Sequence, residues 1–287
     1  MHYFHVDVFS PRPFSGNSLT VFPDAARLSS AQMAAITREM RHFESIFLSR
    51  DVAGDGPWRA RVFDLIEELD FAGHPVIGAA CVLHALHGRA ASETWSMQLK
   101  AGTVEITTHR RGRGRYTSAL DQKAPSFLGR PDIKDLASWF SLSEEDLDAD
   151  LPPEVVSTGL RYLVLPVRSG ALERARIALD LDASLAGLGA QFAYLLDASA
   201  LEARHWNNDG VVEDVATGSG AGCAAAYLRR HGRIRDGEDA VLRQGRFTGR
   251  PSRMTISARG RSEDIRSVRV GGEVAFVATG RLEELPV

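Results

Sequence analysis

The stretch EDVATGSGAGC at residues 213–223 decides the fold, because two acidic residues lead directly into a glycine-rich turn and an alanine-rich helical segment. The first N–H groups of a helix have no partner inside the helix, and the helix dipole favours an anion beside them. We therefore expect this turn to direct backbone N–H groups at an anionic group of a ligand.

A second stretch, ELDFAGHPVIG at residues 68–78, repeats this layout. Aligning Gly73 with Gly218 places His74 opposite Ser219, at the start of both helices. The other matched positions are Glu68 with Glu213, Arg61 and Phe63 with Arg204 and Trp206, and the tripeptide HGR at residues 87–89 and 231–233. An ordered set of matches predicts two related halves, each presenting a helix N-terminus.

Length and composition agree with two domains. The chain has 287 residues and 44% hydrophobic content, enough to bury two cores of roughly 130 to 150 residues each. We place the boundary near Asp121. The first domain then comprises residues 1–120 with a return of the final strand at about 274–287, and the second comprises residues 121–273.

Individual elements can be predicted around the two glycine-led helices. In the first half we expect Ser30 to cap a helix over residues 31–41, and Pro75 to take the first helical position, where its missing N–H costs nothing. In the second half we expect a helix over residues 171–177. The last strands are predicted at residues 240–244, 253–258, 265–270 and 274–277.

The overall charge argues against nucleic-acid or membrane partners, since the net charge is only −3. The basic run RRGRGR at residues 110–115 is expected to be a solvated hairpin tip, with an anion or nucleic-acid contact as the alternative. Cys81 and Cys223, both in alanine-rich helical context, indicate buried thiols in a reduced, cytoplasmic protein. The first residues alternate like a strand rather than forming the apolar core of a signal peptide.

Several motifs together resemble the PhzF family, the phenazine-biosynthesis isomerases and their relatives. They are FESIF at residues 43–47, ELDFAGHPVIG at 68–78, EDVATGS at 213–219, QGRFTGRPS at 244–252 and, more loosely, GNSLTVF at 16–22. The resemblance covers essentially the whole chain in the right order. It implies the diaminopimelate-epimerase fold, an α/β (α+β) class in which two pseudo-symmetric domains each wrap a curved, mostly antiparallel sheet around a central helix. It also implies a cleft between the domains, a homodimer and no cofactor.

The chemistry can be followed from the residues. Backbone N–H groups at Gly73 and Gly218, with donors from His74 and Ser219, suit the carboxylate of a small amino-carboxylate substrate. Asp214, beside the second turn, can accept hydrogen bonds from an amino group. These three features together fit a small amino acid.

Glu44 is the candidate acid and base, because its apolar flanks, Phe43 and Ile46, suit a carboxyl that both takes and returns a proton. The resemblance assigns proton transfer to the glutamate of the FESIF motif, and we take His74 and Asp214 as its catalytic companions. The same resemblance places Asn17 among the substrate-binding residues. It implies an isomerase of secondary metabolism, such as antibiotic biosynthesis, that shifts a proton and a double bond in an unsaturated, cyclic amino acid.

Other readings of the sequence stay open. Amino-acid racemases of this fold resemble the chain but carry a cysteine before each helix glycine, where this chain has Ala72 and Thr217, so a two-thiol racemase is disfavoured. The two alternatives are an epimerase that uses Glu44 with another acid and an inactive ligand-binding homologue. His84 and His87 lack a third ligand, so we expect an exposed helix end and no metal. Residues 220–225 fit a dinucleotide pattern, but no buried apolar strand precedes them.

Overall fold

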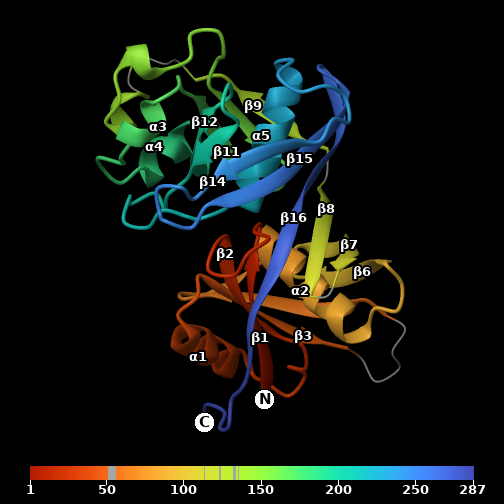
Figure 1. Ribbon diagram of the computed structural model, residues 1–287. Coiled ribbons are helices and arrows are strands. Elements are labelled where there is room, and N and C mark those ends of the chain that lie inside the picture. The colour runs from red at the N-terminus through yellow and green to blue at the C-terminus, as the bar shows by residue number, and fades with distance from the viewer. Residues whose placement is uncertain (51–55, 113, 123, 132–133, 135) are drawn as a thin grey trace. The chain divides into compact units, whose positions relative to one another are not determined.

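The computed structural model describes residues 1–50, 56–112, 114–122, 124–131, 134 and 136–287 (Figure 1). The described chain forms two compact units, Met1–Asp121 with Gly271–Val287, and Gln122–Val270. From the sequence we expected boundaries at residue 120 and at about 274. Arg113, within the basic run expected to form a hairpin tip, lies outside the described residues.

Unit 1 is a closed sheet around a helix. Its strands are β1 (His2–Val8), β2 (Asn17–Phe22), β3 (Glu44–Ser49), β4 (Trp58–Asp64), β5 (Glu68–Leu69), β6 (Ser92–Leu99), β7 (Gly102–Gly112), β8 (Arg115–Gln122) and part of β16 (Asp264–Arg281). The order β1-β2-β3-β4-β6-β7-β8-β16 closes because β16 also pairs with β1, and β5 pairs with β4 outside this ring.

Helix α2 (Gly73–His87) fills this barrel and is buried continuously from Gly73 to His84. It packs against β1, β2, β3, β6 and β7. The approach is close at Gly78, where a Cβ would lie 2.6 Å from Leu19 Cδ2 and 2.9 Å from Val8 Cγ2. Apart from its three histidines the helix is apolar on all sides, as expected of one surrounded by sheet.

Helix α1 (Ser30–Met40) lies on the outside of the unit 1 barrel, against β3 and β4 (Figure 1). Ser29 is its N-cap, not Ser30 as we predicted, because Ser29 and Gln32 form a reciprocal capping box. Met33 and Ile36 are buried with Phe47 in a small core of their own.

Unit 2 repeats the plan as a sheet that runs from β16 to β9. Its strands are β9 (Ser126–Gly129), β10 (Glu154–Ser157), β11 (Arg161–Pro166), β12 (Phe192–Asp197), β13 (Glu202–Arg204), β14 (Ala240–Gln244), β15 (Ser252–Arg261) and part of β16. Helix α5 (Gly218–Arg230) packs against β10, β11, β12 and β15. The short helices α3 (Ala171–Arg174) and α4 (Asp182–Gly187) pack against β12, and the turns η1 (Ser138–Phe140) and η2 (Glu144–Asp146) precede β10.

The strand pairings confirm that the two halves are related. Both sheets are mostly antiparallel, and each contains two parallel pairs of strands that are connected in the sequence through helices. The pairs are β2 with β3 and β4 with β6 in unit 1, and β11 with β12 and β13 with β14 in unit 2. Gly73 and Gly218, which we aligned from the sequence, are the first residues of α2 and α5. The fold class predicted from the sequence is therefore correct.

Three other element predictions were wrong in detail. The strands expected at 265–270 and 274–277 are one continuous strand, β16, which runs through Gly271. Pro75 is the third residue of α2 rather than the first, still within the turn whose N–H groups have no helical acceptor. Helix α3 ends at Arg174, three residues before the end that we expected.

Candidate active site

A carboxylate and an imidazole meet at the N-terminal end of α2 in unit 1. Glu44 begins β3 and pairs with Leu19 of β2, whose side chain packs against α2 at Gly78. Side chains of paired residues share a face of the sheet, so Glu44 points toward the same helix. Its Oε2 lies 3.3 Å from Nε2 of His74, the second residue of α2. The Glu44 and His74 side chains are 20% and 6% exposed, so the pair is largely shielded from solvent.

The first turn of α2 provides backbone donors beside this pair. Its N-cap, Ala72, has an extended backbone and makes no side-chain cap hydrogen bond. Pro75 brings no N–H to the turn, so the donors here belong to residues around Gly73 and His74. Gly73 and His74 are both buried. A carboxylate beside Gly73 would therefore meet amide donors and the positive end of the helix dipole.

Asn17 lies on the same face of β2 as Leu19, two residues before it. It is 1% exposed and pairs with Val8 of β1. Its position depends on Gly16, which has a φ of +77° and whose Cβ would lie 2.4 Å from the Val8 carbonyl oxygen. Only glycine fits there. The residues predicted for unit 1, Asn17, Glu44, Gly73 and His74, thus belong to neighbouring strands and the helix that they enclose.

In unit 2 the predicted residues gather at the start of α5. Thr217 is the N-cap, Gly218 is the first helical residue, and no side-chain cap bond is made. The hydroxyl of Ser219 lies 2.8 Å from that of Tyr162 on β11. Asp214 accepts a 2.6 Å hydrogen bond on Oδ2 from the Thr217 hydroxyl and a 3.3 Å bond on Oδ1 from the Ala216 N–H. The shared cleft that we expected between the two turns stays a prediction.

The two matched acids, Glu68 and Glu213, each bind an arginine side chain. Glu213 accepts two hydrogen bonds from Arg204, at 2.9 and 2.6 Å, and Glu68 accepts two from Arg61, at 2.8 and 2.6 Å. Each guanidinium also lies over the matched aromatic ring: Arg204 at 4.3 Å from the centroid of Trp206 and Arg61 at 5.2 Å from that of Phe63. These two Arg–Glu clasps hold the segment before each turn, and the Arg61 hydrogen bond lowers the pKa of Glu68.

Sequence reasoning missed the residues that support Asp214. Gln244, the last residue of β14, donates to the Asp214 carbonyl and to the Thr217 hydroxyl. Tyr194 of β12 in turn donates to Gln244 Oε1 at 2.9 Å. These partners are far apart in the chain, so no local pattern connects them. The only available signal was that Gln244 opens a motif that we had already singled out.

The remaining candidates are structural. His84 is fully buried rather than exposed as we expected: Nδ1 lies 2.7 Å from Thr108 Oγ1 and Nε2 3.1 Å from the Ala90 carbonyl oxygen. Cys81 and Cys223 are buried free thiols, as predicted, and burial raises the pKa of Cys223 to about 11. The described residues hold no group of His, Cys, Asp and Glu suited to a metal ion, and none of the described helices is long and apolar enough to cross a membrane.

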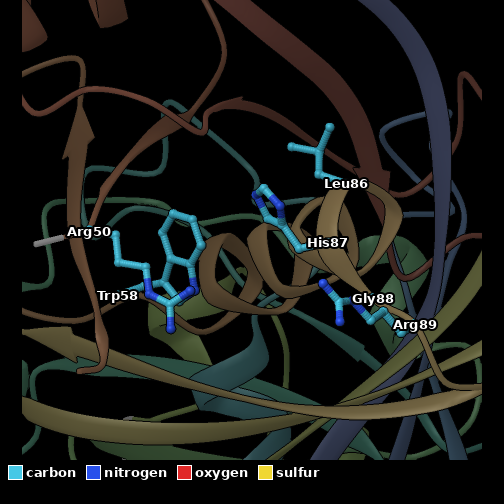
Figure 2. Close-up of a pocket in the computed structure, with 6 residues that line it drawn as sticks. All are labelled: Arg50, Trp58, Leu86, His87, Gly88 and Arg89. Carbon is cyan, nitrogen blue, oxygen red and sulfur yellow. The ribbon is translucent and has the colours of Figure 1, made fainter. Parts of the chain in front are cut away.

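A pocket lies at the other end of α2. Figure 2 shows Trp58 with Arg50 on one side and His87 on the other, and Leu86, Gly88 and Arg89 complete the lining. The Arg50 guanidinium is 5.4 Å from the indole centroid, and the His87 ring stacks at 5.5 Å. Since α2 rises 1.5 Å per residue, this pocket is roughly 20 Å along the helix from His74. It does not belong to the Glu44 site.

The comparisons with known proteins agree with one another. Residues 6–280 match the model of a family described as "Phenazine biosynthesis-like protein". A curated relative named trans-2,3-dihydro-3-hydroxyanthranilate isomerase, from Pseudomonas chlororaphis, is 32% identical over 98% of this chain and 99% of its own. The protein of the same name from Pseudomonas aeruginosa is 33% identical over the same shares.

Solved structures extend the likeness. One described as "a Predicted Epimerase", from Pseudomonas aeruginosa, has a TM-score of 0.90 and 48% identity, covering 99% of both chains. A hydroxyproline epimerase from Agrobacterium vitis has a TM-score of 0.64 over 98% of this chain and 90% of its own. At 14% identity, the second structure shows a shared fold alone.

Proposed function

Because the chain belongs to the phenazine biosynthesis-like family PhzC-PhzF, we propose that it is a cofactor-independent isomerase of a small, unsaturated cyclic amino acid, with Glu44 as the proton carrier. Three relatives at 32–33% identity are named trans-2,3-dihydro-3-hydroxyanthranilate isomerase, which supports this class of substrate. The observation that carries the proposal is the 3.3 Å contact between Glu44 Oε2 and His74 Nε2 at the start of the central helix.

In the proposed reaction the Glu44 carboxylate removes a proton from a ring carbon of the substrate. The electron pair of that C–H bond moves the neighbouring double bond, and Glu44 returns the proton to another carbon of the conjugated system. Substrate and product contain the same atoms and electrons, so the step needs no oxidant, reductant or co-reactant. His74 can donate a hydrogen bond to Glu44 or to the substrate and keep the carboxyl group aimed at the reacting carbon.

The turns at Gly73 and Gly218 are proposed to bind the carboxylate, and Asp214 the amino group. The support comes from each unit separately. The first turns of α2 and α5 have no side-chain cap hydrogen bond, and in unit 2 the Asp214 carboxylate accepts a hydrogen bond from Thr217. That both turns bind the same substrate molecule stays a prediction. So do the homodimer and the cytoplasmic location.

The first test is turnover of trans-2,3-dihydro-3-hydroxyanthranilate in heavy water, followed by NMR. The Glu44 side chain is 20% exposed, so its carboxyl proton can exchange with heavy water before it is returned. We therefore expect the wild type to move the double bond and to place deuterium on the carbon that is protonated. Glu44→Gln should slow both events by roughly 10²- to 10⁴-fold, the usual contribution of a positioned acid or base.

Glu67→Gln is the matched control, because Glu67 is exposed in the turn after β4 and should not affect turnover. Equal deuterium incorporation by the wild type and Glu44→Gln would remove Glu44 from its role. Turnover of a different cyclic amino acid would narrow the substrate class. Binding without exchange across such a panel would favour an inactive ligand-binding homologue.

The second candidate function is an epimerase, which the 48% identical structure described as a predicted epimerase favours. Inverting a stereocentre requires a base that removes the proton from one face and an acid that donates a proton to the other, and neither Ala72 nor Thr217 provides the thiol that racemases of this fold carry. The second donor would have to be another acid. Chiral chromatography with ultraviolet detection separates the two functions, since a double-bond isomer differs from the substrate in its ultraviolet absorption, whereas an epimer differs from it only in retention.

A further inference from the structure

We propose that Thr217 and Gln244 are positioning residues that fix the direction of the Asp214 carboxylate and so determine its recognition of the substrate amino group. The inference rests on the proposed function for the identity of the bound group. The orientation of Asp214 itself can be tested without any ligand. All the residues involved belong to unit 2.

The side-chain amide of Gln244 uses its full hydrogen-bonding capacity. Its Oε1 accepts from Tyr194 Oη at 2.9 Å and from the Thr217 N–H at 3.2 Å. Its Nε2 donates to the Asp214 carbonyl oxygen at 2.9 Å and to Thr217 Oγ1 at 3.0 Å. A primary amide has two N–H donors and two acceptor lone pairs, so all four are occupied. The amide therefore has one orientation in this structure.

This orientation fixes the direction of the Thr217 hydroxyl. An amide nitrogen can only donate, so Thr217 Oγ1 must accept from Gln244 Nε2. The hydroxyl proton is then directed at Asp214 Oδ2, 2.6 Å away. Asp214 is thereby held as an acceptor, which suits an ammonium group, whose polar hydrogens can only donate.

The far end of the chain of hydrogen bonds is fixed by burial. Gln244 is 1% exposed and Tyr194 is fully buried. Burial, and then the charge of Asp214, raise the pKa of Tyr194 well above its ordinary value, so its hydroxyl keeps its proton and donates to Gln244. Networks of this kind are costly to leave partly satisfied, so the side chains are not free to rotate independently.

The other half of the molecule shows that the hydroxyl is not needed to begin such a helix. Ala72 is the N-cap of α2 at the position that matches Thr217, and α2 begins at Gly73 without any side-chain cap. Thr217 is the N-cap of α5, and its side chain likewise makes no cap hydrogen bond to that helix. The Thr217 hydroxyl instead donates its hydrogen bond to Asp214 Oδ2.

The test compares Thr217→Val, which keeps the shape and loses the hydroxyl, with Thr217→Ser, which keeps the hydroxyl. Hydrogen exchange of the peptide covering residues 214–218, measured without ligand, should be faster in Thr217→Val and close to wild type in Thr217→Ser, with the unit 1 peptides unchanged. Unchanged exchange in Thr217→Val would overturn the inference. Gln244→Met should reproduce the Thr217→Val result. If Gln244→Met does not fold, the comparison of Thr217→Val with Thr217→Ser decides alone.

Calorimetric binding of 2-aminocyclohexanecarboxylate and of cyclohexanecarboxylate tests the link to the amino group. Loss of a hydrogen bond that orients a charged partner should weaken binding of the amino acid about 10-fold in Thr217→Val. Binding of the deaminated acid should not change, and Thr217→Ser should restore the wild-type difference. Equal weakening for both acids would overturn the assignment to the amino group. A wild type that binds neither acid contradicts the proposed function, while the exchange data still decide the positioning.

With the substrate itself, a positioning role predicts a higher KM and a nearly unchanged kcat in Thr217→Val, because binding of the amino group contributes equally before and during reaction. A general loss of folding would lower the amount of active enzyme and leave KM unchanged. The reverse result, a lower kcat with KM unchanged, would contradict the role that we assign to Thr217.

Discussion

Replacing Glu213 by glutamine removes the negative charge from the buried Arg–Glu clasp. Arg204 is 2% exposed and lies between the rings of Trp206 and Phe247, at 4.3 and 4.2 Å from their centroids. Breaking a buried ion pair on one side costs roughly 3–5 kcal/mol, because the remaining charge stays desolvated. Glutamine keeps one acceptor oxygen, and the carbonyls of Leu172 and Ala175 still accept from Arg204. We therefore expect a loss of about 3 kcal/mol in the stability of unit 2.

The clasp in unit 1 provides a matched control. Arg61 makes the same two hydrogen bonds to Glu68, but its side chain is 28% exposed, so water can replace the lost partner. Glu68→Gln should cost about 1 kcal/mol or less. Hydrogen exchange at increasing urea, read from peptides of each unit, measures the two losses separately. Equal losses in the two variants, or a larger loss for Glu68→Gln, would refute the reasoning from burial.

Three further experiments test other parts of the structure. Burial lowers the pKa of His205 below its ordinary 6.5, so the folded state resists protonation of this residue. Unit 2 should therefore lose stability as the pH falls below about 6.5, and the loss should be less steep in His205→Gln; urea titrations at several pH values measure both. Gly78→Ala forces a Cβ to within 2.6 Å of Leu19 and should cost about 1–3 kcal/mol by overpacking, which thermal unfolding of unit 1 measures. Cys81 and Cys223 should not react with a thiol reagent in the native protein and should both react in urea; fast native labelling would contradict their burial and raised pKa.

The sequence predicted the parts of the fold that are encoded locally. Each glycine-led helix has its signal within a few residues, and aligning Gly73 with Gly218 located both helix starts. The N-cap of α1 could also have been predicted correctly from local sequence, because Ser29 and Gln32 have the spacing of a capping box, whereas Ser30 has no such partner. Glu44 and His74 were both singled out, but their contact depends on how β3 and α2 pack, which no local pattern encodes.

Two glycines explain where local reasoning failed. We predicted separate strands at residues 265–270 and 274–277, on either side of Gly271 and Gly272, yet the chain stays extended there within β16. A Cβ on Gly271 would lie 2.3 Å from the Ser118 carbonyl oxygen, so this glycine permits a close approach of strands rather than a turn. Likewise, the partners of Gln244 lie 27 and 50 residues away, at Thr217 and Tyr194, where spacing in the sequence has no predictive value.

The long strand β16 makes the completion of unit 1 depend on the order of synthesis. Its residues 271–281 close the barrel between β1 and β8, but they follow the whole of unit 2 in the chain. While the ribosome makes unit 2, the seam beside β1 stays open, and an unpaired strand edge invites wrong partners. The second unit can therefore fold first, and a nascent chain halted before Gly271 should be a client for chaperones.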